Sequence, residues 1–333
     1  MSRYELFDRK QIELWDLSRR GNDLLAENCL PLAPPQSPYA HPEFDQLLQR
    51  IAAARAADRP LILMMGAHPI KLGLSRFLID LIERRWITHL AVNGAGMIHD
   101  FELASFGGTS ESVAKWICEG QFGLWRETGE LNELAREAAA AGAGLGETLG
   151  RRVEERQPAN VQLSLAAAAW RAGTPMTVHV GIGNDIIHAH PNFDGAAWGQ
   201  ASYTDFLIFA RNVQKLNGGV FLNVGTAVMG PEVFLKALSM ARNVARQRGE
   251  SLRDFSTAVF DLVDLPPDWR NGPPSKEHQQ YYYRPWKTIL SRTVSDGGGS
   301  FYFRGDHRQT IPTLWHGLRT KVHHGGHGEK EKQ

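Results

Sequence analysis

The stretch LILMMGAHPIKLGLSRFLIDLIERRWITHLAVNGAGMIHD, residues 61–100, decides the fold class. It begins with an apolar run at residues 61–66, continues with a helical pattern at 74–83, and reaches a second apolar run at 88–93. Strands that are apolar throughout and are separated by a helix are typical of parallel strands covered on both faces. The stretch therefore predicts a βαβ unit within an α/β protein.

The same alternation continues through most of the chain. A helix is predicted at residues 203–216, and another at 231–246 with Pro231 in its first turn. Further strands are predicted at residues 176–181, 219–225, 257–263 and 300–304. The pattern predicts a mostly parallel sheet with helices on both faces.

Three regions are expected along the chain. Residues 1–57 are predicted to form an N-terminal helical arm, with helices near 12–17 and 42–55 on either side of the proline-rich PLAPPQSP. Residues 58–320 are predicted to form the α/β domain. The polar tail at 321–333 is expected to be disordered.

The composition excludes several classes of protein. The 333 residues include 42% hydrophobic and 22% charged residues, and the net charge is +1. A charge so close to zero gives no global attraction to nucleic acid or to a membrane. No apolar run is long enough to span a bilayer, no signal peptide is evident, and two cysteines form no disulfide framework. We therefore expect a cytoplasmic protein with neither nucleic-acid nor membrane partners.

Polar side chains follow most of the predicted strands. In an open α/β sheet, ligands bind at the carboxyl ends of the strands, so these loops are expected to line one crevice. A single His or Asp in such a loop is more often a helix cap than a catalyst, but five loops at one edge favour a site. The candidates are His68, Lys71, Asn93, His99, Asp100, His179, Asn184, Asp185, His188, His190, Thr226, Glu232, Lys236, Arg304, Asp306 and His307.

The loop after the third strand, VHVGIGNDIIHAHPNFDGA, is the richest in histidine. The side chains of His179, Asp185, His188 and His190 are of the types that bind transition metals, although their spacing matches no zinc motif. The alternative is a hydrogen-bonded structural loop. No GxGxxG sequence opens a βαβ unit, and no GxxxxGK[ST] sequence is present.

Lys287 lies in the aromatic segment YYYRPWKTI, residues 281–289. Desolvation among aromatic rings favours the neutral form of a lysine, and a neutral amine is a nucleophile that can form an imine. The alternative is a surface lysine whose stem packs on a ring.

The order of these segments resembles the deoxyhypusine synthase family over about residues 60–318. Residues 61–100 are similar to the family's first βαβ segment, which ends in a TAGG-type turn. GIGNDIIHAH is similar to its D-G-S-x-G-D segment, and GVFLNVGTAVMGPEVFLKAL to its glycine-rich turn after a late strand. RPWKTI resembles its W-G-K, and GDHRQTIP its A-D-A-S-x-x-x-P. The resemblance implies a Rossmann-like domain in a homotetramer whose sites lie between paired subunits.

The resemblance also implies roles for single residues. Lys287 would form the imine and Trp286 would be its aromatic neighbour, while Asp185 would hold a polyamine-like donor. Lys236 falls near the histidine that helps to bind spermidine in the family. The dinucleotide NAD would lie near His68, Lys71, Asn93, Gly94, Ala95, Thr226 and Asp306. His99 and His188 are expected to move protons.

Ile98 and His99 stand where the family has two glutamates. This loss of acids favours an anionic or amide-bearing ligand over a polycation. The expected function is that of a deoxyhypusine synthase-like, NAD-dependent transferase. It would move an aminoalkyl group from a polyamine-like donor to a small amine acceptor through a lysine imine. The alternatives are a metal-dependent enzyme that uses the histidine-rich loop and a non-catalytic, ligand-binding homo-oligomer.

Overall fold

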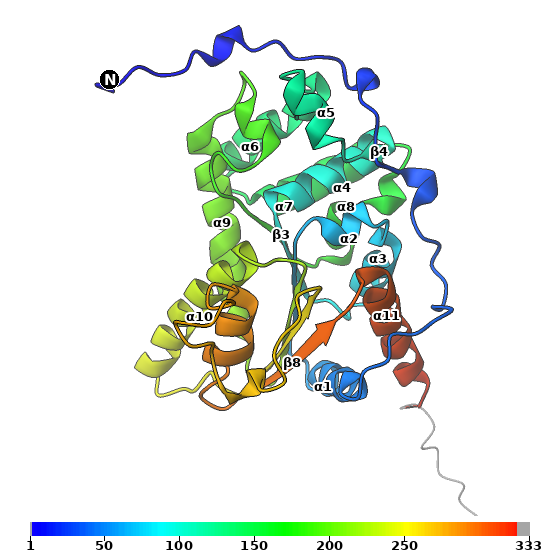
Figure 1. Ribbon diagram of the computed structural model, residues 1–333, viewed down its shortest axis with the longest axis vertical. Helices are drawn as coiled ribbons and strands as arrows, with labels where there is room; N and C mark the ends of the chain where they lie inside the picture. The colour runs from blue at the N-terminus through cyan, green and yellow to red at the C-terminus, as the bar shows by residue number, and fades with distance from the viewer. Residues whose placement is uncertain (1, 325–333) are drawn as a thin grey trace, which may run out of the picture.

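The computed structural model describes residues 2–324. Six parallel strands form one sheet in the order β5-β3-β2-β6-β7-β8. The strands are β2 (Leu61–Met65), β3 (His89–Asn93), β5 (Met176–His179), β6 (Val220–Val224), β7 (Ser256–Asp261) and β8 (Gly299–Arg304). Renumbered along the chain this order is 3-2-1-4-5-6, which is the order of the Rossmann fold. The predicted α/β, Rossmann-like fold is confirmed (Figure 1).

Two apolar cores cover the two faces of the sheet. Along β2, Leu61, Leu63 and Met65 enter one core while Ile62 and Met64 enter the other, as expected from the alternation of side chains along a strand. The first core holds residues of α1 (Phe44–Ala56), α3 (Ser75–Glu83), α4 (Gly94–Phe106), α7 (Leu145–Arg156), α8 (Leu165–Ala172) and α11 (His307–His324). The second holds residues of α10 (Met229–Gln247), of the π-helix η8 (Pro285–Arg292) and of the C-terminal half of α9 (Gly195–Val213).

The predicted boundaries of the central elements agree with the structure, apart from one helix. α10 carries Pro231 in its first turn, as predicted. α9, by contrast, begins at Gly195 rather than near residue 203. The Asp194 side chain accepts hydrogen bonds from the backbone N–H groups of Ala196 and Ala197 and so caps the helix there.

The N-terminal arm is not helical throughout. α1 confirms the second predicted helix, but the helix predicted near residues 12–17 is wrong. Residues 2–30 form a strap that runs over the top of the molecule and down one side (Figure 1). Its backbone bonds go to the body: Trp15 N–H donates to Leu124 O at 3.1 Å, and Leu17 N–H to Glu127 Oε2 at 2.8 Å. Farther on, β1 (Leu24–Leu25) pairs antiparallel with β4 (Gly108–Thr109).

At the other end of the chain, α11 continues to His324. Residues 321–324 are therefore helical rather than part of the predicted disordered tail, and residues 325–333 lie outside the described residues. Within residues 2–324, no helix has the length and apolar character needed to cross a membrane.

Candidate functional site

A cavity of about 250 Å³ opens beside the carboxyl ends of β3 and β5. Its charged walls come from five segments: the strap, the short helix α2 (His68–Lys71), α4, the segment after β4, and the loop after β5. We call it the acidic cavity, and its charged lining residues are Arg20, Lys71, Glu102, Glu111 and Asp185. Apolar side chains, among them Ile98, Val113, Phe122 and Ile186, form the rest of its wall.

Asp185 is held at the edge of this cavity by a capping box. Its side chain accepts a bond from the His188 backbone N–H, and the His188 side chain accepts one from the Asp185 backbone N–H. The carboxylate rests on the first residue of α4, where a Cβ at Gly94 would lie 2.6 Å from Asp185 Cγ. Burial raises the pKa of Asp185 to about 6. In residues 2–324 its only ionisable partner is His188, with Nε2 3.9 Å from Oδ2.

His188 itself is bound into the loop. Nδ1 accepts bonds from the backbone N–H groups of Gly183 (3.1 Å) and Asp185 (3.2 Å). The ring packs against Phe193 and Trp198. Because Nδ1 is an acceptor, the proton of the neutral ring is on Nε2. Burial lowers the pKa of His188 to about 4, so His188 is neutral near pH 7 and gives Asp185 no positive charge.

The other two histidines of the loop point elsewhere. His179 Nε2 lies 3.1 Å from Thr177 Oγ1, whereas His190 Nε2 donates to Gly123 O at 2.8 Å. In the part of the chain that the structure describes, no three His, Cys, Asp or Glu side chains gather in a way that could hold a metal ion. The hypothesis of a metal site at His179, Asp185, His188 and His190 is therefore wrong, and the structural alternative describes this loop.

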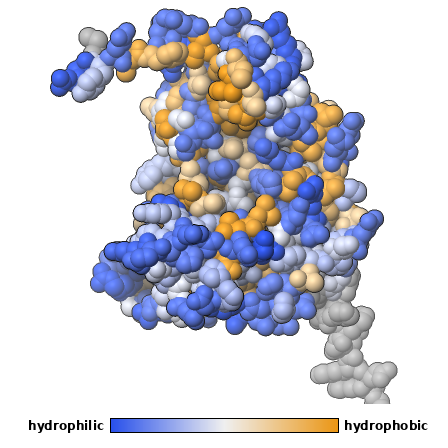
Figure 2. Space-filling model, in the orientation of Figure 1, coloured by the Kyte–Doolittle hydropathy of each residue, from blue (hydrophilic) through white to orange (hydrophobic). Residues whose placement is uncertain are grey.

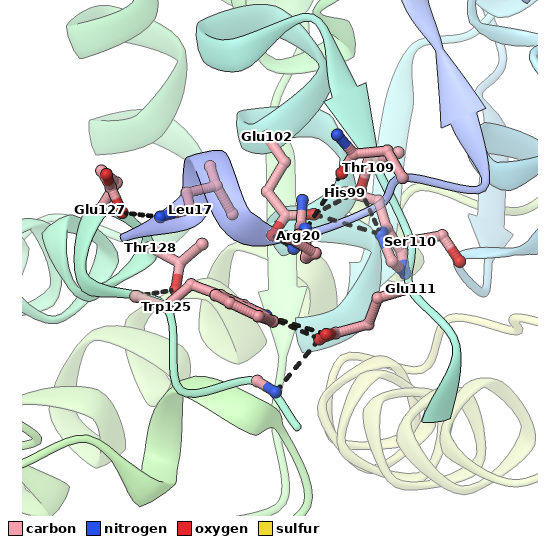
Figure 3. A network of polar contacts seen from close by, with 12 residues as sticks. Leu17, Arg20, His99, Glu102, Thr109, Ser110, Glu111, Trp125, Glu127 and Thr128 are labelled. Atoms are coloured by element: carbon pink, nitrogen blue, oxygen red, sulfur yellow. Dashed lines mark hydrogen bonds and ion pairs between the residues drawn. The ribbon is translucent and has the colours of Figure 1, made fainter. Parts of the chain in front are cut away.

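Two carboxylates in the cavity were not predicted. Glu102 pairs with Arg20 of the strap (Nη1 to Oε1, 2.6 Å), and each side chain is only 1% exposed. Glu111 accepts bonds from Trp125 Nε1 and from the Gly123 backbone N–H, and burial raises its pKa (Figure 3). The expected loss of acids is thus corrected: three carboxylates line the cavity against the cations Arg20 and Lys71. One signal was available, since Glu102 follows Ile98 and His99 by one turn on the same helix.

The ends of the two central strands form a second group. Gly66 follows β2 and Gly225 follows β6, and a Cβ at Gly66 would overlap the Gly225 carbonyl oxygen. Of the predicted cofactor residues, His68 begins α2 just after Gly66, and Thr226 follows Gly225. The His68 ring packs against His307, with 5.6 Å between the ring centres. This is the position at which the strand order reverses, where a Rossmann sheet binds its dinucleotide. The two turns are closely packed, since the Gly66 N–H donates to Val224 O and the Gly225 N–H to Phe260 O, each at 3.1 Å, and only glycine fits at Gly66.

The other predicted cofactor residues are divided between different environments. Asn93 caps α4 through a bond from Gly96 N–H (2.9 Å), and Gly94 lies under the Asp185 carboxylate. The N-terminus of α4 therefore already faces a negative charge. Lys71 and Ala95 line the acidic cavity. Asp306, at the end of β8, pairs with Arg308 at 2.8 Å, and this bond lowers the pKa of Asp306.

Lys287, Trp286 and Lys236 do not line the acidic cavity of their own chain. They lie on η8 and α10, in the lower part of Figure 1, whereas α4 and α5 lie in the upper part. Lys287 Nζ sits 3.3 Å from the centre of the Tyr281 ring, and the indole N–H of Trp286 donates to Trp269 O and Gly272 O. Lys236 pairs with Glu232.

No protein-family model matches the sequence, and no curated protein does. Among solved structures, the chain is similar to AgrE in its ternary complex with ornithine and NAD+, with 11% identity and a TM-score of 0.50. The match covers 83% of this chain and 32% of that one, so the chain spans about a third of the length of AgrE. The likeness shows a shared Rossmann-like fold.

Two further structures are similar. One is a conserved putative LOR/SDH protein from Methanococcus maripaludis S2, with 12% identity and a TM-score of 0.48 over 87% of this chain and 74% of that one. The other is a putative deoxyhypusine synthase from Entamoeba histolytica, with 10% identity and a TM-score of 0.37 over 79% of this chain and 75% of that one.

Proposed function

We propose that the chain is a deoxyhypusine synthase-like, NAD-dependent transferase that binds a cationic amine in the acidic cavity. In this reaction an aminoalkyl group moves from a polyamine-like donor to a small amine acceptor. The observation that carries the proposal is the state of Asp185: its side chain is 11% exposed, and within residues 2–324 it has no cationic partner. A desolvated carboxylate without a partner is unfavourable, and a bound ammonium group would supply one.

The rest of the cavity supports an amine that carries a hydrocarbon chain. Its apolar wall of Ile98, Val113, Phe122 and Ile186 offers contacts to methylene groups. The volume of about 250 Å³ lies below the roughly 300–1,000 Å³ typical of pockets for drug-sized ligands. A small aliphatic amine is the class of ligand that combines these features.

His68 and Thr226 are the residues that would hold NAD over the ends of β2 and β6. When bound, NAD would accept a hydride from the carbon next to the amine nitrogen. The chain's own residues would do the remaining work: Asp185 orients the ammonium group, and His99 takes a proton from it.

The lysine imine requires a second subunit. Since Lys287 does not line its own cavity, we propose that Lys287 reaches the cavity of a neighbouring subunit in a homotetramer. The Lys287 amine would add to the oxidised carbon as the nucleophile, and the remainder of the donor would leave as a free amine. The acceptor amine would then displace Lys287 and become the new imine nitrogen. Return of the hydride to that imine carbon would leave the aminoalkyl group on the acceptor and restore the oxidised cofactor.

Exposed apolar side chains near the acidic cavity and near Lys287 support this arrangement. Val113 and Ile182 are 53% and 56% exposed near the cavity, and Tyr282 beside Lys287 is 76% exposed. Apolar surface gathers in the upper half of the face in Figure 2, around α5 (Val113–Cys118) and α6 (Glu130–Ala141), whereas the surface over α10 is largely hydrophilic. Such surfaces are typical of sites that a partner covers.

Calorimetry of NAD binding with and without spermidine tests the proposal. We expect NAD to bind, spermidine to bind the NAD complex, and NADH to form. Asp185→Asn should lose spermidine binding and retain NAD binding, while the exposed Asp268→Asn control retains both. Binding of both ligands without NADH formation would favour the non-catalytic alternative, and absence of NAD binding would overturn the proposal.

A further inference from the structure

Thr109 connects two titratable side chains of the acidic cavity. Its Oγ1 lies 2.6 Å from His99 Nδ1, and its hydroxyl donates to Glu102 Oε2 (Figure 3). A hydroxyl group has one proton. Because that proton points at Glu102, the bond to His99 must use the Nδ1 proton, with Thr109 as the acceptor. In its neutral form His99 is therefore the Nδ1–H tautomer, with its lone pair on Nε2.

The direction of this chain of bonds depends on Glu102 being ionised. Burial alone would raise the pKa of Glu102, but the neighbouring His99 and Arg20 together bring it below its ordinary value. Arg20 Nη1 lies 2.6 Å from Oε1 and fixes one carboxylate oxygen. An ionised carboxylate can only accept, so the Thr109 hydroxyl has to donate to Oε2.

The series of hydrogen bonds that runs through Glu102 and Thr109 ends at the His99 ring, whose other nitrogen is Nε2. His99 lines the cavity with its side chain 15% exposed, and Nε2 has no hydrogen-bond partner within the described residues 2–324. His188 has the opposite arrangement, since its Nδ1 accepts two backbone bonds and its Nε2 is buried. Of these two histidines, only His99 offers a lone pair to the cavity.

We infer that Arg20, Glu102 and Thr109 are positioning residues that hold His99 in the Nδ1–H tautomer and present Nε2 as the proton acceptor of the cavity. An ammonium group there would give its proton to Nε2 and become a neutral amine, while His99 becomes an imidazolium. The ionised Glu102, with Oε2 3.8 Å from Nδ1, would stabilise that positive charge. The inference rests on the proposed function only in taking an amine as the source of the proton.

The strap holds two parts of this arrangement in place. It supplies Arg20, and its Leu24 pairs with Thr109 in the β1–β4 ladder. Next to this pair, Asp23 N–H donates to Ser110 O at 3.0 Å, and the Ser110 hydroxyl donates to Asp23 Oδ2 at 2.9 Å. By holding Arg20 and Thr109 in place, the strap helps to fix the tautomer of His99 on α4.

Long-range proton–nitrogen NMR of the ¹⁵N-labelled protein tests the inference, with the His99 signals assigned by their loss in His99→Gln. We expect Nδ1 protonated and Nε2 unprotonated in the wild type. Thr109→Val should mix the two tautomers of His99 and lower kcat at least tenfold with little change in KM. Thr109→Ser should restore both the Nδ1–H tautomer and the wild-type kcat. An Nε2–H tautomer in the wild type, or an unchanged tautomer in Thr109→Val, would overturn the inference.

This measurement is independent of turnover. If NAD and spermidine fail to bind, the proposed function fails while the tautomer still decides the inference. If Thr109→Val does not fold, the tautomer of the wild type decides it alone.

Discussion

Gly94 and Asp185 pack closely against each other: a Cβ at Gly94 would lie 2.6 Å from Cγ of Asp185. The pair joins the first turn of α4 to the loop after β5. Only glycine leaves room for the carboxylate at this position, so the helix that follows β3 and the acid that follows β5 depend on one another.

Gly94→Ala should displace the Asp185 carboxylate from the cavity. We expect a lower melting temperature and at least a tenfold loss in amine affinity, because a charged hydrogen bond of roughly 1.5–3 kcal/mol is lost. Gly199→Ala is the matched control: Gly199 lies within α9, and a Cβ there would meet no atom within 4 Å. It should stabilise the protein by about 0.5–1 kcal/mol. Equal effects of the two substitutions on binding would contradict the contact.

Amine binding should depend on pH through Asp185. Burial raises the pKa of Asp185 to about 6, so the carboxylate is protonated below that pH and ionised above it. Affinity for a cationic amine should therefore rise between pH 5 and pH 7 and then level off. Calorimetry across this range measures the effect, and Asp185→Asn should remove most of it. A flat profile in the wild type would show that the ammonium group binds elsewhere.

The buried ion pair of the strap should contribute far more to the free energy of unfolding than an exposed pair does. Arg20→Met leaves Glu102 buried and unpaired, which should cost about 3–5 kcal/mol and loosen the strap toward proteases. Arg126→Met removes a pair with Asp16 in which both side chains are at least half exposed, and it should cost at most about 1 kcal/mol. Urea denaturation and limited proteolysis of both variants check this order. Similar losses in the two variants would refute it.

Asp205 should make the protein less stable as the pH rises. It accepts bonds from Val178 N–H (2.9 Å) and Gly146 N–H (3.1 Å), yet burial raises its pKa to about 8. Between the ordinary aspartate pKa and pH 8, the folded protein holds a proton that the unfolded chain releases. This contribution to stability is complete at low pH and is lost as the pH passes 8.

Urea denaturation at pH 5 and pH 9 tests this expectation with Asp205→Asn. The stability of the wild type relative to the variant should fall as the pH rises. A constant difference over this range would mean that Asp205 is already ionised in the folded protein at pH 5. Asp268→Asn is the exposed control, and its stability should follow that of the wild type.

Mixed oligomers can test whether Lys287 acts in a neighbouring subunit. Lys287→Arg and Asp185→Asn should each abolish turnover while keeping the fold. In oligomers co-assembled from both variants, some sites combine an intact Asp185 with an intact Lys287, and about a quarter of the wild-type activity should return if sites lie between paired subunits. No recovery in oligomers shown to be mixed would place both residues in one subunit or would exclude the imine.

The sheet could be predicted because its strands are apolar on both sides, a local property that residues 61–65 already show. The strap could not. Trp15 and Leu17 fit a helical pattern, but they pack on Trp116 and Trp125, and such distant contacts override local preference.

Of the residues that line the cavity, the sequence pointed only to those that closely follow a strand. Asp185 and His99 were found because loops at the carboxyl edge direct attention to them. Glu102 was missed because it lies a full turn inside a helix, and Arg20 because it lies 82 residues from its partner in the sequence. The histidines near Asp185 suggested metal chemistry, since residue type alone does not show which atom a ring nitrogen faces.

The strap also makes ligand recognition separable from the scaffold. The six strands and their helices hold most of the two apolar cores, whereas the first thirty or so residues supply Arg20, one side of the β1–β4 ladder and the core side chains Leu24 and Cys29. A protein shortened by proteolysis within this segment would lose the charge balance of its cavity together with these core contacts. Exchanging this one segment between related chains would then be an economical route to new ligand preferences, in the laboratory as in evolution.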